Sequence, residues 1–399
     1  MTETLTSAAT TPGRPARLPL LDVMRGVAIL GTLMTNVWIF TSPGAEWAVL
    51  SGGQGEMSFD SVPAAAESTM RLLANGKFLS LLTILFGVGL AIQYSAAERR
   101  GAPWPGRYRW RALFLFAEGT VHFLLVFAWD VLMGYAVTAL LVAWLLTRTP
   151  KARHRVMWWA AGLHLALIGL LTAGLLAEGA QGGTQGGTQG GESVPPEVVD
   201  LYAHGGYLEQ VRFRLDNALD FRMEPLLSFC LLVFLFLLGV RLFRAGAFGS
   251  DATGRRLRAR LLVWGLGLGL PLSVALSQAG PDLFFLDRYV AGPLMALGYL
   301  GLTGALVERV RRPGPLLNGL TAVGRTALSG YVLQNVLCVF VSYGIGLGLA
   351  HRLDESWRPW WVMGLWALVC AVLMAGSTLW LRRFRTGPLE SVQKWALRH

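Results

Sequence analysis

The sequence carries little charge for its length. Only 15% of its 399 residues are charged, whereas a soluble globular domain averages about 25%. Hydrophobic residues make up 53% of the chain, and the mean hydropathy is +0.48. So few polar side chains cannot cover so much apolar surface in water. The composition therefore excludes the soluble multidomain proteins that this length would otherwise allow.

Cysteine is scarce, and the motifs of common enzymes are missing. The three cysteines, Cys230, Cys338 and Cys370, fall within apolar runs, which excludes an exported disulfide framework and offers no metal-ligand spacing. The sequence has no Walker loop, no GxSxG elbow, no HExxH motif and no glycine fingerprint after a strand. The glycines at 265–270 indicate helix packing. We therefore expect no metal.

What the chain does have is a series of long uncharged runs, such as 226–240, 261–279 and 360–381. Each approaches the roughly 20 residues that cross the hydrocarbon core as a helix. The runs are continuous rather than alternating, which favours helices over a membrane barrel. We predict an all-α polytopic membrane helical bundle of about ten transmembrane helices. The predicted spans are 20–41, 78–96, 111–129, 131–147, 156–177, 225–243, 261–279, 288–308, 325–349 and 359–381.

The net charge of +11 lies mostly in the short loops between the spans, so it predicts topology rather than nucleic-acid binding. With the N-terminus inside, 27 of the 35 lysines and arginines fall on the inner side. Positively charged loops stay in the cytoplasm. We therefore expect a multi-pass protein of the bacterial inner membrane, with both termini in the cytoplasm and the lipid bilayer as its first partner.

A low-complexity tract divides the chain into two halves. Residues 1–19 form a polar N-terminus that we expect to be disordered and cytoplasmic, and 20–177 form the first five-helix half. Residues 178–224 form an extracytoplasmic linker, which includes the flexible tract GGTQGGTQGG and then an interfacial helix. Residues 225–399 form the second five-helix half and a cytoplasmic tail.

Polar side chains inside the predicted spans are candidate site residues, because they are costly in hydrocarbon. In the first span, Asp22, Arg25 and Asn36 share one face of the helix. Asp22 and Arg25 can pair at the inner rim, and Asn36 lies near the outer end. The alternative is a helix anchor plus an asparagine that bonds to a neighbouring helix.

The third span holds the set of ionisable side chains that is best suited to proton transfer. Glu118 and His122 are four residues apart and can touch, as a general base and its carboxylate partner do. Asp130 follows two turns later, about 12 Å from His122 on a straight helix. A direct contact between His122 and Asp130 would require a bend. The alternative is a buried histidine that Glu118 merely satisfies.

The ninth span has one polar face, formed by Tyr331, Gln334 and Asn335. Arg325 marks its cytoplasmic start. A helix N-terminus that carries an arginine is suited to bind an anion such as a phosphate group. The alternative is hydrogen bonding between helices and a positive charge that only sets topology.

Six blocks of sequence resemble the YeiB-type family of uncharacterised bacterial membrane proteins. They are LLDVMRGVAILGTLMTN, NGKFLSLLTILFGVGLAIQ, RWRALFLFAEGTVHFLLVFAWDVLMGYA, GPLMALGYLGL, VGRTALSGYVLQNVLC and RFRTGPLES. That family looks like a branch of a wider transmembrane acyltransferase superfamily. One member is the lysosomal enzyme that moves acetyl from acetyl-CoA to terminal glucosamine. The shared pattern is Asp22, Arg25, Gly26 and Asn36, but the first histidine after Asn36 here is the distant His122.

The resemblance implies transfer of an acyl group from cytoplasmic acyl-CoA, with acetyl-CoA as the first candidate, to a small-molecule or glycan acceptor. In this hypothesis the catalytic residues are His122, Glu118, Asn36 and Asp130, with His122 as base and Asn36 at the oxyanion. The CoA-binding residues are Arg25, Asp22, Arg325, Tyr331, Gln334 and Asn335. The alternative is a proton-coupled transporter or flippase of a small or amphipathic solute. We expect no nucleic-acid partner and leave a homodimer open.

Overall fold

The computed structural model describes residues 19–50, 57–182 and 194–397, and every regular element within these ranges is helical. The predicted disordered N-terminus lies outside them except for Pro19, as does the GGTQGGTQGG tract except for Gly182. The longer helices are α1 (Pro19–Phe40), α3 (Lys77–Arg99), α4 (Tyr108–Leu125), α5 (Leu132–Leu146), α6 (Pro150–Gly182), α10 (Met223–Arg244), α11 (Ala252–Gln278), α13 (Gly292–Arg309), α15 (Ala327–Ser342) and α17 (Arg358–Arg383).

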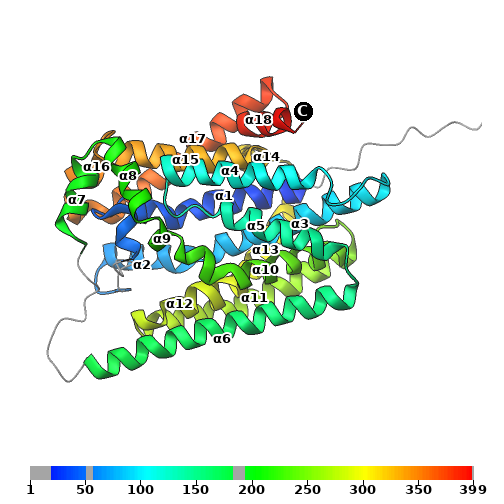
Figure 1. Cartoon of the computed structure of the whole chain (residues 1–399), viewed down its shortest axis with the longest axis horizontal. Helices are drawn as coiled ribbons and strands as arrows, with labels where there is room; N and C mark the ends of the chain where they lie inside the picture. The colour runs from blue at the N-terminus through cyan, green and yellow to red at the C-terminus, as the bar shows by residue number, and fades with distance from the viewer. Residues whose placement is uncertain (1–18, 51–56, 183–193, 398–399) are drawn as a thin grey trace, which may run out of the picture.

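Shorter helices connect these ten. They are η1 (Ala45–Val49), α2 (Val62–Ala74), α7 (Pro196–Ala203), α8 (Tyr207–Asp216), α9 (Ala218–Phe221), η2 (Pro281–Leu283), α12 (Phe284–Leu286), η3 (Asp287–Ala291), α14 (Pro315–Arg325), α16 (Leu349–Arg352), η4 (Glu355–Trp357) and α18 (Pro388–Ala396). Several of them, such as α7, α8 and α16, gather at one end of the molecule, on the left of Figure 1.

Each predicted span overlaps one of the ten longer helices, so the predicted all-α membrane bundle is confirmed as a fold class. Within the described ranges, seven helical segments are long and apolar enough to cross a membrane, and α5 and α15 are shorter apolar helices. The ninth span is shorter than predicted. The backbone breaks at Thr326, which separates α14 from α15, and turns extended at Tyr343.

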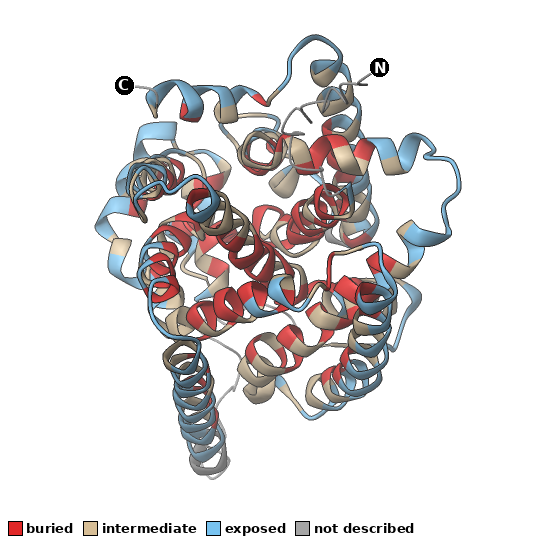
Figure 2. Ribbon diagram, turned by 90° about the vertical axis from the view of Figure 1, so that its right-hand side faces the viewer, coloured by how far each residue is buried: buried red, intermediate tan, exposed pale blue. Residues whose placement is uncertain are grey.

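The periphery of the bundle has the composition of a surface that faces lipid. Figure 2 looks along the helices and shows the buried residues on their inner faces and the exposed ones outside. On α6 the exposed side chains include Trp158, Trp159 and Leu163, and on α11 they include Val263 and Trp264. Large apolar side chains gathered along whole helices are unsuited to water, so these helices favour a bilayer environment.

α1 runs through the middle of the bundle and packs against α3, α14, α15 and α17. Its crossing with α14 is close because glycine lies on both sides. A β-carbon at Gly324 would lie 1.7 Å from the carbonyl oxygen of Asp22, and one at Gly26 would lie 2.1 Å from that of Leu320. The crossing therefore fixes the segment of α1 that carries Asp22 and Arg25.

We expect Gly324→Ala to lower the free energy of unfolding by about 2–3 kcal/mol, because the added methyl group meets main-chain atoms that cannot rotate away. Thermal unfolding of the purified protein in detergent measures the change. Gly364→Ala in α17 is the control, because a β-carbon there meets open space. It should keep or raise the melting temperature. Equal melting temperatures for Gly324→Ala and wild type would contradict the close crossing.

Candidate functional site

The site begins where α4 ends. The chain leaves α4 at Leu125, before the predicted end of that span at 129, and turns back on itself. The backbone N–H groups of Val126 and Phe127 both donate to the carbonyl oxygen of His122, at 2.8 and 2.9 Å. This turn returns Asp130 to the helix, with Oδ2 3.0 Å from Nδ1 of His122. The bend that a direct His–Asp contact requires is therefore present: the two groups lie at ion-pair distance, although Nδ1 has no hydrogen-bond partner among the described residues.

A glycine makes room for the returning chain. A β-carbon on Gly119 of α4 would lie 2.8 Å from Oδ1 of Asp130 and 2.8 Å from the backbone nitrogen of Met133. Asp130 is anchored on its other side by the N–H of Leu132, which donates to Oδ1 at 2.9 Å. The carboxyl group is thus held between α4 and the start of α5.

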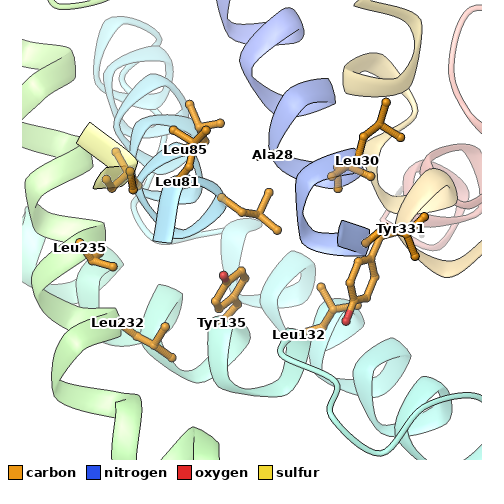
Figure 3. Packing of buried hydrophobic residues seen from close by; sticks show 14 of the residues in the cluster. Ala28, Leu30, Leu81, Leu85, Leu132, Tyr135, Leu232, Leu235 and Tyr331 are labelled. Carbon is orange, nitrogen blue, oxygen red and sulfur yellow. The ribbon is translucent and has the colours of Figure 1, made fainter. Parts of the chain in front are cut away.

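The polar face of α15 supplies the second half of the site. The hydroxyl of Tyr331 donates to Oδ2 of Asp130 at 3.2 Å, and Nδ2 of Asn335 lies 3.2 Å from Nε2 of His122. Figure 3 shows Tyr331 reaching from α15 toward Leu132 at the start of α5. His122, Asp130 and Asn335 are almost completely buried. Each ring nitrogen of His122 therefore faces a buried polar side chain.

This arrangement favours one tautomer of His122. A carboxylate at Asp130 accepts hydrogen bonds and does not donate them, so it favours the proton on Nδ1. Nε2 is then an acceptor, which suits the amide N–H of Asn335 beside it. Such a histidine can take up a proton at Nε2, as a general base does.

Two side chains of α8 and the side chain of Arg222, at the junction of α9 and α10, hold the turn in place. Where α4 ends, its last carbonyl groups have no partner within the helix. Three side chains donate to carbonyl oxygens of this turn: Tyr207 to Leu125 (2.7 Å), Arg214 to Leu124 (3.1 Å) and Arg222 to Asp130 (2.9 Å). The predicted interfacial helix of the 178–224 linker is thus three short helices in the structure, and part of this segment caps α4.

A buried carboxylate, Glu46 of η1, ties the cap together. Its Oε2 lies 2.8 Å from Nε of Arg214 and accepts from the hydroxyl of Tyr202 at 2.8 Å, while its Oε1 accepts from the N–H of Ala128 at 3.1 Å. Burial raises the pKa of Tyr202 well above its ordinary value, and Glu46 adds to the rise. Burial opposes the charge of Arg214, but Glu46 outweighs it and raises the pKa of that guanidinium.

Glu118 lies one turn from His122, yet the side chains that contact His122 are Asp130 and Asn335. Both carboxyl oxygens of Glu118 are buried without a hydrogen-bond partner among the described residues, and so are both amide atoms of Gln334 on α15. Buried polar atoms are usually hydrogen-bonded. These two side chains are therefore available to a bound molecule.

Asn36 is half-buried on α1 and is not among the side chains that contact the ring nitrogens of His122. Arg25 and Asp22 lie together, with 3.6 Å between Nη1 and Oδ1. Arg25 approaches α3 at Gly89, and the charge of Arg111 on α4 acts on it.

Arg111 in turn donates to Gln93 of α3 at 3.1 Å. One end of α1, α3 and α4 therefore gathers two arginines, Arg25 and Arg111. His122 lies toward the opposite end of α4.

The N-terminus of α15, where we predicted a phosphate near Arg325, holds a carboxylate of the chain itself. Glu390 of α18 accepts from the N–H of Leu328 at 2.8 Å and from the hydroxyl of Ser329 at 2.6 Å. The helix dipole favours an anion at this place. The motif RFRTGPLES therefore docks α18 onto α15, and an outside anion would have to displace Glu390.

A second buried cluster lies at the end of α2. Nζ of Lys77 lies 2.8 and 3.0 Å from the two carboxyl oxygens of Asp287, which begins the π-helical turn η3. Asn75 donates to Asp287 and accepts from Arg288, at 3.3 and 2.8 Å. Arg288 also pairs with Glu224 at 2.6 Å. Lys77 and Arg288, two of the eight basic residues that the predicted topology leaves on the outer side, are thus parts of one buried network.

Two cavities border this cluster. One has a volume of about 40 Å³ and is lined by Asp130, Tyr135, Glu224 and Arg288, among others. The other has a volume of about 320 Å³ and lies on the side of Asn75 and Asp287. The first cavity therefore connects the surroundings of the charged cluster with those of Asp130.

Sequence reasoning missed Glu46, Arg214, Arg222 and Glu390. Glu46 and Arg214 are separated by 168 residues, and no spacing rule links them. Arg222 is also one of the eight basic residues left on the outer side, and the topology argument assigns such residues no partner. Glu390 had a signal, because it lies in one of the six blocks quoted above, but its partner on α15 was not evident from the sequence.

The comparisons agree with the resemblance stated above. The family described as "Protein of unknown function (DUF418)" matches residues 242–398. The uncharacterized protein YxaH of Bacillus subtilis (strain 168) is 26% identical over 385 residues, covering 94% of this chain and 92% of the relative. The uncharacterized protein YeiB of Escherichia coli (strain K12) is 28% identical over 389 residues, covering 93% of each. The regions matched by these two relatives include both α4 and α15, the helices that form the site.

Proposed function

We propose that this chain, a membrane protein of the YeiB-like family, transfers an acyl group from acyl-CoA to an acceptor alcohol or amine. The observation that supports the proposal best is the buried position of His122 between Asp130 and Asn335. As the acceptor attacks the thioester carbonyl, its proton passes to Nε2 of His122. When the thiolate of CoA leaves, it takes up that proton, so the histidine returns to its starting state.

The side chains around His122 have separate roles in this proposal. Asp130 positions the imidazole and stabilises its charged form once Nε2 is protonated. The amide of Asn335 lies beside Nε2 and would turn to the developing oxyanion, in place of Asn36, which is not among the side chains that contact the ring nitrogens of His122. Glu118 and Gln334 would contact the substrates between the two ends of α4.

The basic end of α1, α3 and α4 suits the phosphates of CoA better than the N-terminus of α15, which Glu390 fills. Arg111 and His122 are eleven residues apart on α4, which is about 16 Å along a helix. An extended pantetheine arm covers such a distance. In the predicted orientation the arginines face the cytoplasm, and His122 lies toward the outer side, where an acceptor would arrive.

We expect Arg25→Gln to weaken binding of CoA to the purified protein by about ten- to hundredfold, because a charge-assisted contact to phosphate contributes about 1.5–3 kcal/mol. Isothermal titration at two salt concentrations measures the effect, and raised salt should weaken the wild type as well. Arg312→Gln, in an exposed loop, is the matched control and should bind CoA normally. Unchanged affinity in Arg25→Gln would remove the donor site from the proposal.

The direct test is turnover. The protein in lipid nanodiscs should release free CoA from acetyl-CoA, and candidate acceptors such as glucosamine or glycerol should speed the release. A second candidate function is transport of a small polar solute, which the charged cluster between two cavities favours. Solute uptake by proteoliposomes that contain no acyl-CoA, together with no CoA release, would favour the transporter.

A further inference from the structure

The cavity of about 320 Å³ has the size of a small-molecule site. It lies between α1, α2, the end of α11 and the η2–α12 segment, and is distinct from the surroundings of His122. Leu276, Pro281 and Phe284 contribute apolar wall, while Trp38 and Arg71 contribute donors. A wall of this mixed kind suits a ligand with one polar end and an apolar body.

Trp38 provides a donor that the protein does not use. The side chain lines the cavity and is 3% exposed, and its Nε1 is buried without a hydrogen-bond partner among the described residues. A buried indole N–H normally has a partner. This unused N–H in a residue of the cavity wall is therefore a candidate donor for a molecule bound there.

Arg71 brings a cation to the same place. Its guanidinium carbon lies 4.6 Å from the centre of the Trp38 ring. Glu67 contacts Nε and Nη2 of Arg71, each at 2.7 Å, and does not engage Nη1. The guanidinium group of Arg71 and the indole ring of Trp38 therefore lie side by side in the cavity wall, a cation beside an unused N–H donor.

The charges around the cavity favour an anion. Arg71 carries its positive charge on the cavity wall, and the like charge of Arg358 acts on it. Asp287 also lines the cavity, but Lys77 neutralises it, at 2.8 Å. The positive charges therefore exceed the negative ones by one in this neighbourhood.

We propose that this cavity binds a carboxylate with an apolar body, with the carboxylate on Trp38 Nε1 and Arg71 Nη1 and the body against Phe284 and Leu276. The site does not depend on acyl transfer at His122. Such a carboxylate has two sources, a water-soluble acid or a fatty acid in the bilayer.

The experiment uses hexanoate as the soluble probe, with hexanamide and hexylammonium as probes of matched shape. The full-length protein is reconstituted in phosphatidylcholine nanodiscs, and binding is followed by the rise in melting temperature and by titration calorimetry. Hexanoate should stabilise the protein in a saturable manner, and the neutral and cationic probes should not. Equal binding of hexanoate and hexanamide would overturn the proposal.

Two variants test the residues. Trp38→Phe keeps the ring and removes only the N–H, and Arg71→Gln removes the cation, so each should weaken hexanoate binding about tenfold or more. The controls are Trp159→Phe, on the exposed face of α6, and Arg212→Gln, which removes an exposed arginine that also pairs with an acid four residues away. If Arg71→Gln fails to fold, the affinity of Trp38→Phe for hexanoate still tests the site. Binding by Trp38→Phe as tight as that of wild type would refute the site.

Palmitate incorporated into the nanodiscs distinguishes the two sources. Stabilisation by hexanoate that depends on Trp38 supports a ligand taken from water. Stabilisation by palmitate alone, with the same dependence on Trp38, supports a carboxylate taken from the membrane. If neither acid stabilises the protein, the cavity does not bind carboxylates.

Discussion

Replacing His122 with glutamine is expected to lower acyl transfer by about 10²–10⁴-fold, because a positioned general base contributes about that much to the rate. Glutamine roughly keeps the size and the hydrogen-bonding capacity of histidine, so Asp130 and Asn335 keep a partner and the fold should survive. Release of CoA from acetyl-CoA by protein in nanodiscs measures the loss, and the melting temperature of the same sample shows whether the protein is folded.

The control for this experiment is a second buried histidine in a long helix of the described part of the chain. His164 of α6 lies 3.2 Å from the carbonyl oxygen of Tyr289 and is as buried as His122. His164→Gln should therefore have a similar effect on stability and leave the rate per folded molecule unchanged. Full activity in folded His122→Gln would show that His122 is only a packed histidine.

The helices were predictable from the sequence because each one depends on a local property. A run of apolar residues must pair its own backbone groups inside a membrane, whatever its neighbours are. Residues 225–243, for example, are helical within α10 at nearly the predicted bounds. The shortening of α15 was not predictable in this way, because the break at Thr326 arises where α14 crosses α1.

The site was predictable only in part. The cost of polar groups in a membrane singled out His122, Tyr331 and Asn335, and the structure brings these three together. The same rule could not choose between Glu118 and Asp130 as the partner of His122. That choice depends on the turn after Leu125, and the turn depends on side chains from segments that are remote in the sequence.

Because the turn after Leu125 depends on remote side chains, we expect a second large effect when one of them is replaced. Glu46→Gln is expected to lower the free energy of unfolding by about 3–5 kcal/mol, because Arg214 stays buried without its counter-charge. The hydrogen bond from the N–H of Ala128 to Oε1 of residue 46 also weakens. The turn that carries Asp130 is then held less firmly. The melting temperature and the rate of CoA release, measured on one sample, should therefore both fall.

Two further variants separate charge from position. Asp216→Asn removes the carboxylate of an exposed ion pair, 3.6 Å from Arg212. It should change neither the melting temperature nor the rate of CoA release, because exposed ion pairs contribute little to stability. The double variant Glu46→Gln with Arg214→Met removes both buried charges, so it should recover much of the stability. It cannot cap the carbonyl of Leu124, so Asp130 is still poorly held and activity should stay low. Recovery of full activity in the double variant would mean that the cap does not position Asp130.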